Sequence, residues 1–298
     1  MSNGSTNTKK AQRLGVELNL ISLLFSSISP VLNKFSLVSL NPIIGGVFTS
    51  VFAAIFNFIL IYIMYRDFSV IKDKLVIALG VTNGIGVLLQ YVALSLLSPV
   101  TVTLIARIYL VYVFVLSYLF LKEKLTAMDY LAVAMCITGS IFVSSGRMEL
   151  DNVWGIVCAF VYPFMYAANN IIAKYLVEDN NPGNVLFYNH VVSAIFLLVT
   201  GLFVNGTFSG IQAKAVTFNF FGAFFNGFLS LLLFYTSLKF ISAGKANIVR
   251  ALGPIVVIIY SYFFFPIAIT ANIIIGAILL IASTAIVTFT KNRSSDAA

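Results

Sequence analysis

The sequence predicts an all-α membrane protein of ten transmembrane helices, arranged as two inverted repeats of five helices each. Three observations carry this prediction. The chain is 60% hydrophobic and only 9% charged, whereas soluble domains are about 45–50% apolar and about 25% charged. It contains ten apolar stretches long enough to cross a bilayer. Finally, a pattern of residues in the first half of the chain recurs in the second half.

The apolar stretches give the elements in chain order. A helix rises about 1.5 Å per residue, so roughly 20 residues cross a hydrocarbon core of ~30 Å. The linkers are short except for a polar stretch at 205–216, so we expect residues 1–298 to form one polytopic unit. The first stretch lacks a small-residue cleavage pattern, which predicts a retained helix. The expected spans lie at about 14–37, 42–65, 75–96, 99–121, 126–145, 153–177, 183–204, 217–240, 244–265 and 270–290.

The repeat is visible in single residues. Gly15 and Lys34 recur with the same spacing as Gly155 and Lys174. A second set recurs 144 positions later and includes Tyr91 with Tyr235, Ser98 with Ser242, and Tyr118 with Tyr262. These matches predict repeat one at 14–146 and repeat two at 153–290. Because each copy holds an odd number of spans, the second copy enters the membrane from the opposite face, a pattern typical of secondary transporters that work by alternating access.

The distribution of charge predicts the orientation. The net charge is +8, and 13 of the 18 Lys and Arg residues fall on the side of the membrane that holds the N-terminus. By the positive-inside rule, this places both termini in the cytoplasm of a multi-pass protein of the cell membrane. The basic character is therefore explained by topology, and we expect no nucleic-acid partner.

Several motifs resemble the drug/metabolite transporter superfamily, and within it the ten-helix EamA-like branch. They are the repeated glycine-to-lysine frame and the stretches 91–94, 98–100, 118–125, 242–246 and 253–254. The resemblance covers nearly the whole chain. It implies a ten-helix carrier, and says little about substrate because the superfamily moves amino acids, amines, nucleosides, sugar phosphates and nucleotide sugars. One departure is Ile267, which stands where repeat one has Glu123.

Two arginines lie well inside predicted spans, where ionisable groups are costly and point to function. Arg107 lies in the fourth span and Arg250 in the ninth, and they miss equivalent positions in the repeat by one residue. One interpretation is that both face a central cavity and bind a carboxylate or phosphate, because a guanidinium bonds an oxyanion bidentately. The other is that Arg250 pairs with Glu17 while Arg107 extends outward to the interface.

The only histidine, His190, lies in the seventh span within Phe187-Tyr188-Asn189-His190. A neutral imidazole could relay a coupling proton, or it could be a hydrogen-bonded packing residue. The tetrapeptide is similar to the tyrosine-asparagine-asparagine motif of nucleotide-sugar carriers, with His190 replacing the last asparagine. We therefore include Asn189 and His190 among the candidate substrate-binding residues.

Polar and aromatic side chains inside other spans complete the candidate site. The amides Asn83, Gln90, Asn170 and Asn226 either line a wet cavity or bridge helices. Tyrosines can stack on a substrate or donate a hydrogen bond to it. The candidate substrate-binding residues are Arg107, Arg250, Asn83, Gln90, Asn226, His190, Asn189, Tyr109 and Tyr166.

These features predict a secondary transporter, an exporter or exchanger, of a small polar metabolite such as an amino acid or organic anion. A sugar-phosphate or nucleotide-sugar carrier and a flippase of a phosphorylated lipid are the alternatives. We predict no enzymatic activity, catalytic residue, metal or cofactor, because the sequence holds no His-rich cluster, no embedded pair of acids and no nucleotide-binding loop. The expected partners are the substrate, the bilayer and a coupling proton or exchanged solute, with the protein acting as a monomer or homodimer.

Overall fold

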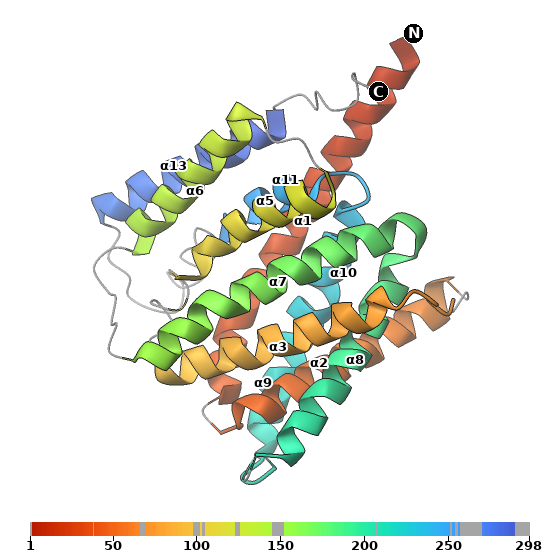
Figure 1. Cartoon of the computed structure of the whole chain (residues 1–298), viewed down its shortest axis with the longest axis vertical. Coiled ribbons are helices and arrows are strands. Elements are labelled where there is room, and N and C mark those ends of the chain that lie inside the picture. The colour runs from red at the N-terminus through yellow and green to blue at the C-terminus, as the bar shows by residue number, and fades with distance from the viewer. Residues whose placement is uncertain are drawn as a thin grey trace.

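The computed structural model of the chain is all-helical over the residues that it describes, and Figure 1 shows the helices packed side by side. The structure describes residues 2–37, 39–65, 69–97, 102, 105–122, 126–144, 152–204, 206, 208–250, 252–253, 256 and 270–289. Repeat one contains α1 (Ser2–Leu37), α2 (Pro42–Leu60) continued by η1 (Ile61–Tyr65), α3 (Leu75–Leu96), η2 (Ala106–Ile108) with α5 (Tyr109–Phe120), and α6 (Ala127–Ser144). Repeat two contains α7 (Val153–Asp179), α8 (Pro182–Leu202), α9 (Ala213–Gly222) continued by η3 (Ala223–Ser230) and α10 (Leu231–Ser237), α11 (Ala243–Arg250), and α13 (Ala271–Phe289).

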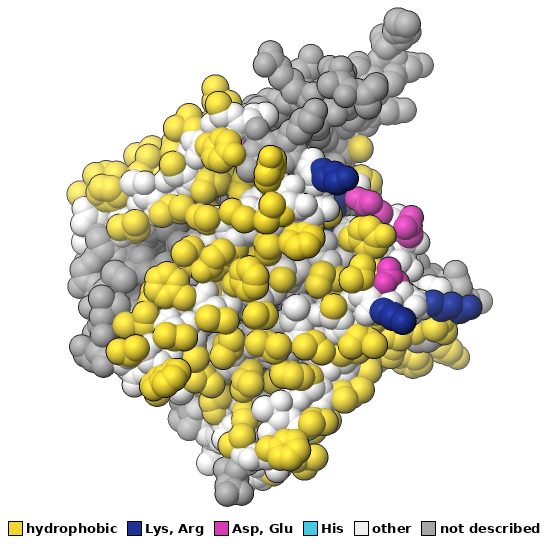
Figure 2. Space-filling model, in the orientation of Figure 1, with side chains coloured by type: hydrophobic (Ala, Val, Ile, Leu, Met, Phe, Trp, Pro, Cys, Tyr) yellow, Lys and Arg dark blue, Asp and Glu magenta, His cyan; other side chains and the backbone are white. Residues whose placement is uncertain are grey.

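The surface fits a bilayer. Five helical stretches are long and apolar enough to cross it: Pro42–Ile63, Leu75–Ala93, Val153–Asp179, Pro182–Leu202 and Ala213–Ser237. Figure 2 shows apolar side chains covering the face formed by α3, α7 and α8, with the charged side chains gathered at one edge. That edge lies where α7 ends and α3 begins, on the side of the molecule at which α1 begins (Figure 1). We call this side the N-terminal side.

Equivalent helices begin in the same way. The side chain of Asn41 accepts a hydrogen bond from the backbone of Ile43, and Pro42 occupies the first turn of α2. Asn181 does the same for Gly183, and Pro182 occupies the first turn of α8. Asn is a favoured N-cap, and Pro suits the first turn because it lacks an N–H that the helix would leave unpaired. Both helices therefore start at local sequence signals placed 140 residues apart.

The repeated glycines make equivalent close contacts across the two repeats. A Cβ on Gly15 of α1 would lie 2.9 Å from Phe240 Cβ, just after α10. A Cβ on Gly155 of α7 would lie 2.7 Å from Leu97 Cγ, just after α3. Phe240 and Ile241 stand 144 positions after Leu96 and Leu97, which contact Gly155. The first helix of each repeat thus packs against the third helix of the other.

The remaining helices pair with their own counterparts: α2 packs on α8, α5 on α11, and α6 on α13. This arrangement confirms the predicted fold of two inverted five-helix repeats.

Candidate functional site

Both repeats contribute to a central cavity of about 360 Å³. The walls come from α2, α3, the η2–α5 segment, α7, α8, η3, α10 and α11. Most lining side chains are amides, tyrosines or small residues, and the described lining contains no Asp or Glu. The lining residues are Thr49, Ser50, Asn83, Val87, Gln90, Ala106, Tyr109, Tyr162, Pro163, Tyr166, Asn169, Asn170, His190, Asn226, Gly227, Leu231, Asn247 and Arg250.

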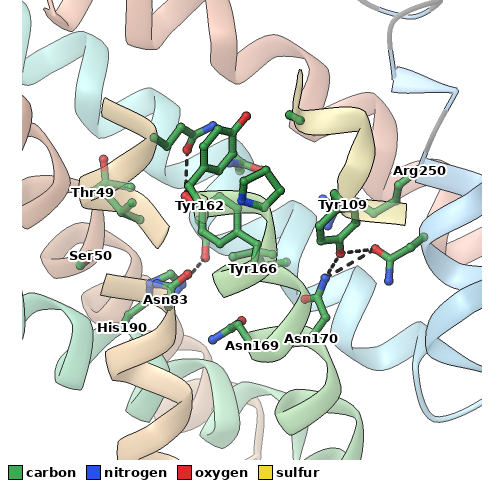
Figure 3. A pocket seen from close by; sticks show the side chains of 18 residues that line it. Thr49, Ser50, Asn83, Tyr109, Tyr162, Tyr166, Asn169, Asn170, His190 and Arg250 are labelled. Carbon is green, nitrogen blue, oxygen red and sulfur yellow. Dashed lines mark hydrogen bonds between the residues drawn. The ribbon is translucent and has the colours of Figure 1, made fainter. Parts of the chain in front are cut away.

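Seven of the nine candidate residues named from the sequence line this cavity: Asn83, Gln90, Tyr109, Tyr166, His190, Asn226 and Arg250. Figure 3 shows Tyr109, Asn170 and Arg250 on one side of it, and Thr49, Ser50, Asn83 and His190 on the other. Asn189 is not in the lining. Its amide donates to Tyr235 Oη (3.0 Å) and its carbonyl accepts from Asn169 (3.4 Å), which places it directly behind the wall. The side chain of Arg107 lies outside the described residues.

Arg250 ends α11 and is held by neutral partners. Its Nη2 donates to Ser230 Oγ at 3.0 Å, and its guanidinium carbon lies 4.4 Å from the centre of the Phe234 ring. Glu17, the alternative partner considered from the sequence, instead forms an ion pair with Arg13 at 2.7 Å. The pairing of Arg250 with Glu17 is therefore wrong for this structure. Within the described chain no carboxylate neutralises Arg250, although it lines a cavity inside the membrane.

A hydrogen-bonded group of side chains from three helices lies beside Arg250. The Tyr109 hydroxyl donates to Asn247 Oδ1 at 2.5 Å. The Asn170 amide donates to the Tyr109 hydroxyl and lies 3.5 Å from the same Asn247 oxygen. Asn247 was missed in the sequence, and the signal that could have found it is its position one helical turn before Arg250.

The opposite wall is also held by hydrogen bonds. His190 Nε2 lies 2.9 Å from the carbonyl oxygen of Gly227 and must donate to it, because a carbonyl only accepts. Asn83 donates to Ser193 Oγ (2.9 Å), and the Tyr166 hydroxyl donates to Gln90 Oε1 (2.8 Å). These amides therefore bridge helices and line the cavity at the same time.

Thr49 and Ser50 were also missed. They stand 140 positions before Asn189 and His190, the spacing that relates α2 to α8. The side chain of Thr49 donates to Asn219 Oδ1 at 3.2 Å, which joins α2 to α9. Applying the repeat to the candidate residues would have found both.

Comparison with known proteins agrees with the fold. The model of the EamA-like transporter family matches residues 13–145 and 153–289, one match in each repeat. An uncharacterized transporter of Bacillus subtilis, YyaM, is 28% identical over 194 residues, which cover 62% of this chain and 64% of that protein. The chain thus spans just under two thirds of the length of that relative.

Two further similarities cover more of the chain. An uncharacterized transporter of Methanothermobacter thermautotrophicus is 24% identical over 255 residues, covering 78% of this chain and 73% of that protein. A solved crystal structure at 12% sequence identity has a TM-score of 0.77 and covers 94% of this chain and 98% of its own, which shows a shared fold. With a family match over both repeats, the chain belongs to the EamA-like transporter family.

Proposed function

We propose that the protein is a secondary transporter of a small polar metabolite that carries an anionic group, an amino acid or an organic anion. The observation that carries this proposal is Arg250, a cation in the wall of a membrane cavity whose described partners are neutral. Its guanidinium has five donors, of which the described residues accept one. A carboxylate or phosphate entering the cavity would satisfy the others through charge-assisted hydrogen bonds.

The size of the cavity favours a small solute. Ligand pockets commonly measure about 300–1,000 Å³, and a cavity of about 360 Å³ lies at the low end of that range. This supports an amino acid or organic anion over a nucleotide sugar. The lining amides and tyrosines offer both donors and acceptors, which suits a polar solute rather than an apolar one.

Alternating access follows from the inverted repeats, which supply two related packings around one site. In the proposed orientation the N-terminal side faces the cytoplasm, as the positive-inside rule favours. Transport then serves export or exchange, driven by a gradient or by the counter-solute.

Transport into proteoliposomes tests the proposal. Arg250→Ala should lower uptake of the transported anion or zwitterion about 30-fold or more, because truncating a buried charged partner costs about 2–5 kcal/mol. The control is Lys214→Ala, which changes an exposed cation in the first turn of α9, outside the cavity lining. Equal transport by the two variants would rule out Arg250 as the anion site.

A further inference from the structure

Tyr109, Asn170 and Asn247 join three helices at one end of the cavity, α5, α7 and α11. All three side chains line the cavity and are bonded to one another. Asn247 also donates to the carbonyl oxygen of Ala243 at 2.8 Å, which fixes its amide to its own helix. We call these three residues the Tyr109 cluster (Figure 3).

The Tyr109 cluster faces a sealed end of the molecule. Between it and the N-terminal side lies a continuous core of buried side chains from the ends of α5, α7 and α10 and the start of α11. These residues are close-packed and almost fully buried, which leaves no path for a polar solute. They are Val113, Leu116, Ala173, Leu176, Val177, Phe234, Tyr235, Leu238, Ile241, Ala243 and Ala246.

At the end of the cavity away from the N-terminal side, the packing is divided. There the buried apolar side chains among the described residues form two separate groups rather than one. The first packs the end of α3 on the start of α7 and includes Ala93, Leu97 and Ala159. The second packs the start of α2 on the end of α8 and includes Ile44 and Leu197. Among the described residues, continuous apolar packing therefore closes the cavity only toward the N-terminal side.

The repeat does not duplicate the Tyr109 cluster. With the spacings that relate the two copies, the counterparts of Tyr109, Asn170 and Asn247 are Gly253, Pro30 and Thr103. Glycine has no side chain and proline has no polar one, so side chains at these positions cannot rebuild the three-way hydrogen bond. In a transporter built from inverted repeats, the two access states use equivalent contacts on opposite sides. A cluster present on one side only stabilises one of those states.

We propose that the Tyr109 cluster is a latch that keeps the cavity closed toward the N-terminal side and makes this the resting state. Arg250 lies on α11 one turn after Asn247, so movement of α11 when an anion binds would strain the hydrogen bond to Tyr109. The latch thus regulates the site described under the proposed function and rests on it for the existence of two access states. It does not depend on the identity of the substrate.

Labelling of engineered cysteines without substrate tests the latch. Ala173 of α7 is fully buried in the sealed core, and Ala93 of α3 is fully buried in the opposite one. Each position is changed to cysteine, as Ala173→Cys or Ala93→Cys, in a chain that also carries Cys158→Ser. The rate at which N-ethylmaleimide labels the new cysteine is then measured. Removing the hydroxyl with Tyr109→Phe should raise the labelling rate at 173 about two- to tenfold and lower it at 93, because a hydrogen bond of ordinary strength is lost.

The matched control is Tyr112→Phe, on the same helix, whose ring packs edge-on against Phe164 and does not line the cavity. Asn247→Ala breaks the cluster from another helix and should shift both rates in the same directions as Tyr109→Phe. Unchanged rates in Tyr109→Phe and Asn247→Ala, or the same shift in Tyr112→Phe, would overturn the latch. Because no substrate is added, a failure of anion binding would show itself separately, in the Arg250 experiment.

Discussion

The two repeats share their packing contacts and differ in their polar side chains. Gly15 and Gly155 approach equivalent helix ends at nearly equal distances, and Asn41 and Asn181 cap equivalent helices. In contrast, Arg250 and Ser230, which are bonded to each other, have the counterparts Ala106 and Gly86. The scaffold is symmetric, whereas the arginine in the described lining of the cavity comes from repeat two.

The third helices show the same divergence in their backbones. In repeat one α3 runs from Leu75 to Leu96 as a continuous α-helix. Its counterpart is interrupted by η3, a π-helical segment at Ala223–Ser230, which carries Asn226 and presents the Gly227 carbonyl to His190. π-helical turns often occur at functional sites. Close packing therefore constrains both copies, whereas the walls of the cavity have diverged between them.

Substituting the repeated glycines should produce the largest loss of stability. Gly15→Ala and Gly155→Ala each place a Cβ within 3.0 Å of a neighbouring side chain, and such overpacking costs about 1–3 kcal/mol. Thermal unfolding in detergent would measure this, with Gly45→Ala as the control because its nearest neighbour would be 3.9 Å away. A loss of stability in only one of the two variants would contradict equivalent packing of the two glycines.

Removing the two helix caps should have a smaller effect, equal in the two repeats. Asn41→Ala and Asn181→Ala each delete a side-chain acceptor at the start of a helix, at a cost of about 1 kcal/mol. Thermal unfolding of the single and double variants would show additive losses, since the two sites belong to different helices. Strongly unequal losses would contradict equivalent roles.

Ser230→Ala should have the smallest effect on transport. It tests whether the hydroxyl that only repeat two has at this position helps to orient Arg250. The hydroxyl accepts from Arg250 and lies 3.1 Å from Ser22 Oγ, and loss of one such bond corresponds to about a two- to tenfold weaker interaction. Transport assays should show this decrease through the orientation of Arg250. Unchanged transport would mean that Phe234 alone positions the guanidinium.

Much of the fold could be predicted from the sequence because the bilayer leaves few options. Each span must satisfy its own backbone hydrogen bonds, so a run of apolar residues fixes a helix and its length. An odd number of spans in each repeat then fixes the inversion. The interruption of the eighth span by η3 could not be predicted, because the sequence of Ala223–Ser230 carries no local signal for a π-helix.

The site could be predicted only in part. Polar side chains inside spans pointed to Asn83, Gln90 and Asn226, because an unpaired amide is costly in hydrocarbon. Whether such a residue faces the cavity depends on the rotation of its helix, which placed Asn189 behind the wall and His190 in it. Thr49 and Ser50 were not singled out because hydroxyl side chains are readily accommodated in a helix by bonding to its own carbonyls.

The most direct test of the central claim, an anionic solute bound at Arg250, is a thermal-shift comparison of amino acids, organic anions, sugar phosphates, nucleotide sugars and amines. A ligand at 100 times its Kd should stabilise the folded state by about 2.7 kcal/mol. We predict that an amino acid or organic anion raises the melting temperature of the wild type and that Arg250→Gln abolishes the shift. A shift caused only by cationic amines, or one that persists in Arg250→Gln, would contradict it.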